Sequence, residues 1–197
     1  VSTLTMPQMV FIETEFLKTL PPRELLTGFA EMIKHGLIFD KAYYKKLKTT
    51  NYLTPSAEDI YRSVAIKNEV VTIDPLEKNL RKILNFGHTI GHAIESFSLA
   101  NDKKPLTHGD SSAIGFICEA DLSIKNSTLS KEELKDISTY ILSLYPKYNI
   151  KQKSFEALLE LMQSDKKNED GNILFSLLES TGKCSFNCRV STGDILS

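Results

Sequence analysis

Apolar residues recur at helical spacing along most of this chain, and this periodicity restricts its fold more than any other feature of the sequence. Residues 24–37 and 55–74 each place their apolar side chains on one side of a helix. The alternation typical of strands occurs only in residues 9–12, 172–178 and 184–190, and a short turn joins the last two. The sequence therefore predicts a mainly α, multi-helical domain with a short N-terminal strand and a small C-terminal β-hairpin.

Capping signals indicate where the helices begin. Ser130 followed by Glu133 is a full capping box, and Ser56 followed by Asp59 is a looser form with a shorter acidic side chain. Asp110 follows a polar loop, and we expect it to cap the next helix. The predicted helices are residues 24–37, 55–74 and 87–99, and three more that begin after Asp110, Ser130 and Ser154.

Length and charge exclude several classes of protein. The 197 residues suffice for one domain and are few for two. Twenty-four basic and twenty-five acidic residues leave a formal charge of -1, which creates no field that attracts nucleic acid or an anionic bilayer. No apolar run approaches the roughly 20 residues of a membrane span, and the first residues lack a signal-peptide pattern. We therefore expect a cytoplasmic protein with neither nucleic acid nor membrane as partner.

The three cysteines do not indicate a disulfide framework, because they are few and odd in number. Cys184 and Cys188 have a spacing that a soft metal ion accepts. They lie in a strand-like stretch, however, which favours ordinary thiols.

Three of the four histidines, His88, His92 and His108, fall within a short window. His88 and His92 are four residues apart, so a helix places both rings on one face. No Glu follows His88, so the metalloprotease pattern His-Glu-x-x-His is not met. Gly87 and Gly91 adjoin the pair at a cost of about 1 kcal/mol each in helix propensity, which indicates close approach by another backbone or a ligand. Two partly buried helix histidines remain the alternative to a metal site.

Glu31 and Lys34 are three residues apart on an otherwise apolar helix. A surface ion pair is one interpretation. The apolar neighbours of Glu31 indicate partial burial instead, and a buried carboxylate needs a cation such as a metal. Glu31, His88 and His108 together would supply the carboxylate and two imidazoles of a catalytic zinc site. Asn85 precedes a predicted helix, where it either caps the helix or offers its amide to a substrate oxygen.

With these residues the chain resembles the C-terminal domain of 3-dehydroquinate synthases, the helical half of that fold. The resemblance implies a divalent metal, Zn2+ or Co2+, bound by Glu31, His88 and His108. It also implies a phosphorylated small-molecule substrate held by Lys34, Lys67, Arg81, Asn85 and His92 and by one of Lys166 and Lys167. The matching stretches are Leu20-Pro21-Pro22-Arg23-Glu24, Gly28-Phe29-Ala30-Glu31-Met32-Ile33-Lys34, Lys67-Asn68-Glu69-Val70-Val71, Leu80-Arg81, the run from Leu84 to Glu95, His108-Gly109, Asp165-Lys166-Lys167 and the hairpin.

The family's reaction, in the shikimate pathway, turns 3-deoxy-D-arabino-heptulosonate 7-phosphate into 3-dehydroquinate and phosphate with enzyme-bound NAD. In the family, NAD is bound mainly by an N-terminal Rossmann-like domain, and the enzyme is expected to be a homodimer. This chain has no glycine-rich phosphate loop after a predicted strand. We therefore expect a fragment that folds, binds metal and is inactive alone.

Two departures from the family pattern are Asp110-Ser111, where Glu-Ala is usual, and Asn79, which replaces a glycine. Asparagine tolerates left-handed backbone angles, so the second change is mild. Two alternatives remain open. One is another sugar-phosphate cyclase, of the 2-deoxy-scyllo-inosose or valiolone synthase type, and the other is a helical module with a non-catalytic metal closed by four protein ligands.

Overall fold

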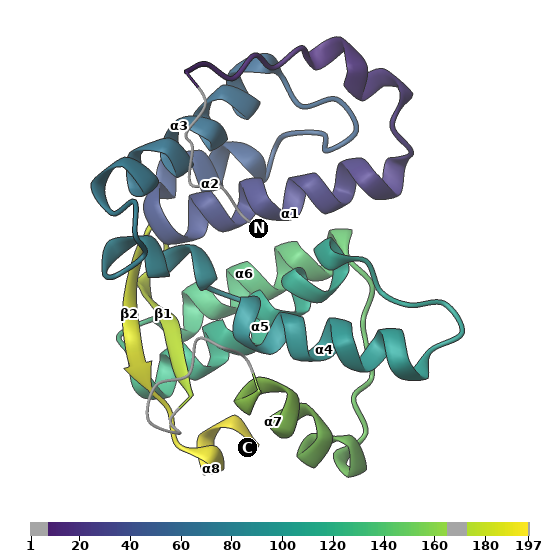
Figure 1. Cartoon of the computed structure of the whole chain (residues 1–197), viewed down its shortest axis with the longest axis vertical. Coiled ribbons are helices and arrows are strands. Elements are labelled where there is room, and N and C mark those ends of the chain that lie inside the picture. Colours follow the sequence, from purple (N-terminus) through teal and green to yellow (C-terminus); the bar gives the residue numbers. More distant parts are fainter. Residues whose placement is uncertain (1–7, 165–172, 197) are drawn as a thin grey trace.

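The computed structural model describes residues 8–164 and 173–196 and consists of two helical layers with a β-hairpin along one end (Figure 1). The first layer holds α1, α2 and α3, and the second holds α4 to α7. The helices and strands are α1 (Pro22–Phe39), α2 (Lys41–Leu47), α3 (Ala57–Ile73), α4 (His88–Asn101), α5 (His108–Asn126), α6 (Lys131–Leu144), α7 (Phe155–Gln163), β1 (Leu174–Ser180), β2 (Lys183–Arg189) and α8 (Thr192–Ile195), with 3-10 helices η1 (Thr14–Thr19), η2 (Leu80–Asn85) and η3 (Gln152–Ser154).

Helix α5 is the centre of the fold, since both hydrophobic clusters of the core include its residues. One cluster joins α5 to α1, α2, α3 and α6, and Phe29, Ile33 and Phe116 are among its fully buried members. The second joins α5 to α4, α7 and the hairpin, with Ile94 and Phe175 fully buried. In each cluster the burial of apolar surface stabilises the packing on α5 by about 25 cal/mol per Å2. Since α1 and α4 both pack on α5, this helix fixes their positions relative to each other.

The hairpin is antiparallel, and its register runs from Leu174 opposite Arg189 to Ser180 opposite Lys183. Its turn docks on the first layer, because Gly182 N–H donates to the carbonyl of Leu37 at 2.7 Å. Gly182 has a φ of 87°, and a Cβ there would lie 2.6 Å from the backbone nitrogen of Lys41. Only glycine meets both conditions without strain.

Several sequence predictions are confirmed. The predicted helices are present, and capping boxes at Ser56 with Asp59 and at Ser130 with Glu133 have both reciprocal hydrogen bonds. The hairpin forms with a two-residue turn where it was expected. The cysteines of the sequence are free thiols.

Two predictions about local structure are wrong. Residues 9–12 form no strand, and their side chains are exposed; a strand needs a neighbour for its backbone hydrogen bonds, and in the described part of the chain none lies beside them. The N-cap of α5 is Thr107, not Asp110. Asp110 is the third helical residue and completes a capping box with Thr107.

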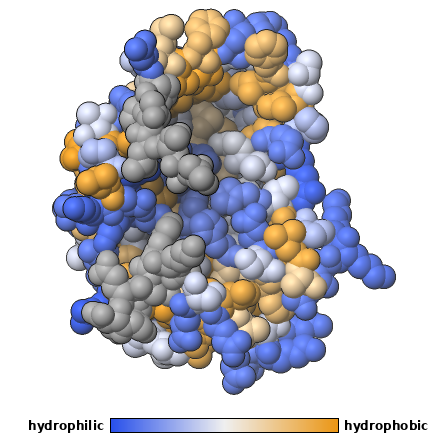
Figure 2. All heavy atoms as spheres, in the orientation of Figure 1, coloured by the Kyte–Doolittle hydropathy of each residue, from blue (hydrophilic) through white to orange (hydrophobic). Residues whose placement is uncertain are grey.

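The surface of the first layer carries an apolar groove between η1, α1 and α3, lined by Leu17, Leu25, Met32 and Val64 among others. Figure 2 shows hydrophobic surface on this upper part of the molecule.

Among residues 8–164 and 173–196, no helix combines the length and apolar character that crossing a bilayer requires.

Candidate metal and substrate site

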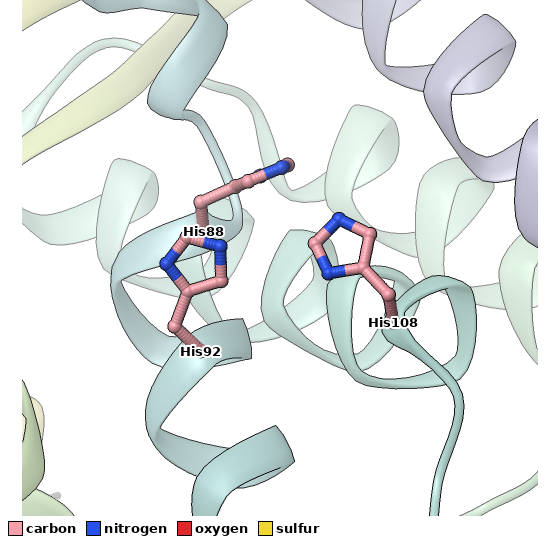
Figure 3. A group of neighbouring side chains, drawn as sticks. All are labelled: His88, His92 and His108. Atoms are coloured by element: carbon pink, nitrogen blue, oxygen red, sulfur yellow. The ribbon is translucent and has the colours of Figure 1, made fainter. Parts of the chain in front are cut away.

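The three histidines of the sequence window converge in the structure (Figure 3). His88 is the first residue of α4, His92 lies one turn later, and His108 is the first residue of α5. The ring of His88 lies 5.0 Å from that of His92 and 5.3 Å from that of His108, between centroids. One nitrogen from each ring lies within 4.8 Å of the others, a spacing that could hold a metal ion.

Glu31 reaches the same place from α1. Its Oε1 lies 3.4 Å from His88 Nε2, and its Oε2 lies 2.8 Å from Lys34 Nζ. Glu31 Oε1 is buried, and no donor among the described residues hydrogen-bonds to it. A buried carboxylate oxygen in that state, beside imidazole nitrogens, fits a cation. Of the predicted ligands, Glu31 and His88 are thus in contact, whereas the three ligand atoms that all lie within 4.8 Å of one another belong to His88, His92 and His108.

Electrostatics favour, in Glu31 and His88, the protonation states that a metal ligand needs. Burial raises the pKa of Glu31, but the contacts with His88 and Lys34 outweigh it and hold that pKa well below its usual value. Burial also lowers the pKa of His88, whose side chain is 11% exposed. At neutral pH the carboxylate is therefore ionised and the His88 ring neutral, as metal ligands must be.

Hydrogen bonds at the outer nitrogens orient two of the rings. His88 Nδ1 lies 3.1 Å from the carbonyl oxygen of Phe86, and His108 Nδ1 lies 3.0 Å from Glu95 Oε2. An Nδ1–H that donates to these oxygens leaves Nε2 as the nitrogen of each ring that could bind a metal. Glu95 ends the sequence motif that contains His88 and His92, but no role was predicted for it. Its position three residues after His92, on the same face of a helix, was the available signal.

The predicted substrate residues lie at different places around the histidines. Lys34 is buried beside them, 3.4 Å from His88 Nε2. Lys67 is exposed on α3. Arg81 and Asn85 belong to η2, where Arg81 donates to the carbonyl of Pro75 and Asn85 donates to Glu77 Oε1. His92 lines a pocket with Leu161 of α7 and Ser164, the C-cap of that helix, and Lys166 and Lys167 lie outside the described residues.

Asp74 shapes the η2 segment that carries Arg81 and Asn85. Its carboxylate accepts hydrogen bonds from the backbone N–H groups of Lys78, Asn79 and Arg81, at 3.0, 2.7 and 3.1 Å. Burial raises the pKa of Asp74, but these three donors outweigh it and the net pKa is lowered. Asn85 is therefore held at the end of η2 and does not cap α4; the N-cap is Gly87, with a φ of 78°.

The family model described as 3-dehydroquinate synthase C-terminal matches residues 28–168 of this sequence. The chain belongs to this family. It is 41% identical over 195 residues to the 3-dehydroquinate synthase of Parabacteroides distasonis, covering 96% of this chain and 55% of the relative. It is 35% identical over 202 residues to that of Thermodesulfovibrio yellowstonii, covering 99% and 55%. The chain thus spans about half the length of the curated relatives it matches.

Solved structures of cyclases share the fold. A 2-deoxy-scyllo-inosose synthase complexed with carbaglucose-6-phosphate, NAD+ and Co2+ aligns with a TM-score of 0.74 at 23% identity, over 93% of this chain and 53% of that one. The 2-epi-5-epi-valiolone synthase from Streptomyces hygroscopicus subsp. jinggangensis 5008, with NAD+ and Zn2+ bound, aligns with a TM-score of 0.71 at 20% identity, over 93% and 52%. The multi-helical half predicted from the sequence is thereby confirmed as a fold.

Proposed function

We propose that this chain is the metal- and substrate-binding domain of a 3-dehydroquinate synthase, which converts 3-deoxy-D-arabino-heptulosonate 7-phosphate into 3-dehydroquinate and phosphate. The observation that carries the proposal is the contact of Glu31 from α1 with His88, which converges with His92 of α4 and His108 of α5, beside the Lys34 ammonium. A carboxylate and two imidazoles with an open position suit a catalytic metal. The enzyme would be a carbon–oxygen lyase of the shikimate pathway.

The residues that would hold the cation, Zn2+ or Co2+, are Glu31, His88 and His108. The buried Glu31 oxygen without a hydrogen-bond donor and the lowered pKa values of Glu31 and His88 support this set. When bound, such an ion supplies Lewis acidity toward a substrate oxygen. His92 lies close enough to the other rings to exchange a proton with a substrate held there.

The substrate carries a phosphate and a carboxylate, and the basic residues of the chain would bind them. Of those that the structure describes, Lys34 is the most deeply buried, since its side chain is 4% exposed, and a charge-assisted hydrogen bond is stronger in such surroundings. Lys67, Arg81 and one of Lys166 and Lys167 would add positive charge. Asn85 would offer its amide to a substrate hydroxyl in exchange for its contact with Glu77.

The proposal includes a second, NAD-binding half. The curated relatives are nearly twice as long as the stretch they share with this chain, and both cyclase structures above contain NAD+. In the described residues no glycine-rich loop joins a strand to a helix, so NAD would be bound elsewhere. The whole enzyme would be a cytoplasmic homodimer.

Phosphate release from the heptulosonate phosphate, in the presence of NAD and Zn2+, tests the function. We expect turnover by the intact enzyme and none by residues 1–197 alone. Glu31→Gln should lower kcat/KM by more than about 100-fold, which exceeds the effect of removing a group that only orients a metal ligand. Glu160→Gln, the same change at an exposed site on α7, should leave it unaltered.

Two results would contradict the proposal. Turnover by residues 1–197 alone would refute the requirement for a second, NAD-binding half. The intact enzyme could also release phosphate from glucose 6-phosphate, which lacks the carboxylate, and not from the heptulosonate phosphate. That result would favour the function of another sugar-phosphate cyclase.

A further inference from the structure

Glu119 is a fully buried acidic residue on α5 that the proposed chemistry does not use. Its Oε2 accepts a hydrogen bond from Gly87 N–H at 2.7 Å, and its Oε1 accepts one from Ile90 N–H at 3.1 Å. These two donors belong to the N-cap and the third residue of α4. In a capping box, two side chains of the helix each accept one of these two hydrogen bonds. Here the single carboxylate of Glu119 accepts both.

Helix α4 depends on this outside group, because its own N-cap provides none. Gly87 has no side chain to accept a hydrogen bond, and a Cβ there would lie 2.0 Å from the ring of Phe116. The first N–H groups of a helix carry partial positive charge, so a carboxylate there is stabilising. α3, α5 and α6 have capping boxes of their own.

The cap also joins the two helices that carry the histidines. The helices approach so closely that a Cβ on Gly115 of α5 would lie 2.0 Å from the carbonyl oxygen of Gly87. The rings of Phe86 and Phe116 stack beside this contact, with centroids 5.7 Å apart. Glu119 therefore anchors the turn that begins with His88 to the helix that begins with His108.

We propose that Glu119 is a positioning residue for the candidate metal site. By capping α4 from α5, its carboxylate sets the place of His88 and His92 relative to His108. The inference rests on the proposed function for the metal, but the cap itself does not. Its loss should let the first turn of α4 open and move the His88 ring away from the common point.

The test compares Glu119→Gln with Ser123→Ala in the intact protein. Gln keeps the shape and one acceptor oxygen but directs an amide N–H2 at a backbone donor. Ser123 is an equally buried polar residue one turn later, which accepts from Leu178 N–H and makes no hydrogen bond to α4 among the described residues. It is thus a matched control for lost stability without a lost cap.

Amide hydrogen exchange at Gly87 and Ile90, Co2+ affinity and the Co2+ visible absorption spectrum are the measurements. We expect Glu119→Gln to speed exchange at both amides, to weaken Co2+ binding by about tenfold, as for other groups that orient metal ligands, and to change the spectrum. Ser123→Ala should lower Tm and leave Co2+ affinity within about twofold, well below that effect. Glu119→Asp, whose shorter carboxylate keeps the charge, should recover part of the affinity.

Unchanged exchange at Ile90 together with unchanged Co2+ affinity in Glu119→Gln would overturn the inference. Equal weakening of Co2+ binding by Ser123→Ala would also overturn it, since general destabilisation would then suffice. If the wild-type protein bound no Co2+, the proposed function would fail. Amide exchange at Gly87 and Ile90 would then decide for or against the cap.

Discussion

Single side chains in this protein have properties that their neighbours in space determine. His35 is adjacent in sequence to the candidate site, yet it is buried with Nδ1 2.7 Å from Ser63 Oγ. Its Nε2 is buried, and no partner for it occurs among the described residues. Burial and the Lys34 ammonium lower the pKa of His35 to about 4. The ring is therefore neutral in the folded protein and becomes charged only at acidic pH.

This lowered pKa predicts a pH-dependent stability. His35 is protonated near pH 6.5 in the unfolded chain and only near pH 4 in the folded chain. Its contribution to the free energy of unfolding is therefore complete above pH 6.5 and is lost as the pH falls toward 4. The loss is about 3 kcal/mol at 1.36 kcal/mol per pKa unit. In His35→Gln, which does not titrate, the free energy of unfolding from urea titrations should fall less over this range. Parallel pH profiles for the two proteins would contradict the prediction.

Helix packing determines which substitutions the elements tolerate. α4 and α5 touch through glycines, and a Cβ on Gly115 would also lie 2.9 Å from Gly91 N. A Cβ added to Gly28, within α1, would meet no atom within 4 Å. The same Gly-to-Ala change should therefore have opposite effects at the two positions.

Gly115→Ala should destabilise the protein by about 1–3 kcal/mol, because the added methyl forces the two helices apart. Gly28→Ala should stabilise it by up to about 1 kcal/mol, because alanine has the higher helix propensity. Urea unfolding of both variants measures the two changes. If both substitutions destabilised the protein, the predicted contrast between helix propensity at Gly28 and packing at Gly115 would be wrong.

The molecule as a whole places its candidate site where two layers meet. Glu31 and Lys34 come from the first layer and the histidines from the second (Figure 1). A cation bound there would join both layers, and unfolding would release it. Metal binding should therefore stabilise the entire fold rather than one helix.

Zinc at 100 times its Kd should raise the free energy of unfolding by about 2.7 kcal/mol, less any binding to the unfolded chain. Thermal denaturation with and without Zn2+ measures this effect. In Glu31→Gln the shift should be smaller, since the link to the first layer is lost. An equal shift in both proteins would place the ion on the histidines alone.

The sequence alone determined what depends on residues close together in the chain. The capping boxes at Ser56 and Ser130 join side chains three residues apart, and the hairpin depends on a local turn. The family motifs that contain Glu31, His88 and His108 are likewise short stretches of contiguous sequence. Such features are readable because their interacting partners lie within one helical turn or one motif.

Only the tertiary structure decided features whose partners lie far apart in the chain. Residues 9–12 form no strand because strand formation needs a neighbour that their own pattern cannot supply. The cap of α4 comes from Glu119, 32 residues after Gly87, and the carboxylate that orients His108 comes from Glu95 on another helix. Packing around α5 brings these groups within hydrogen-bond distance, and no local spacing encodes that approach.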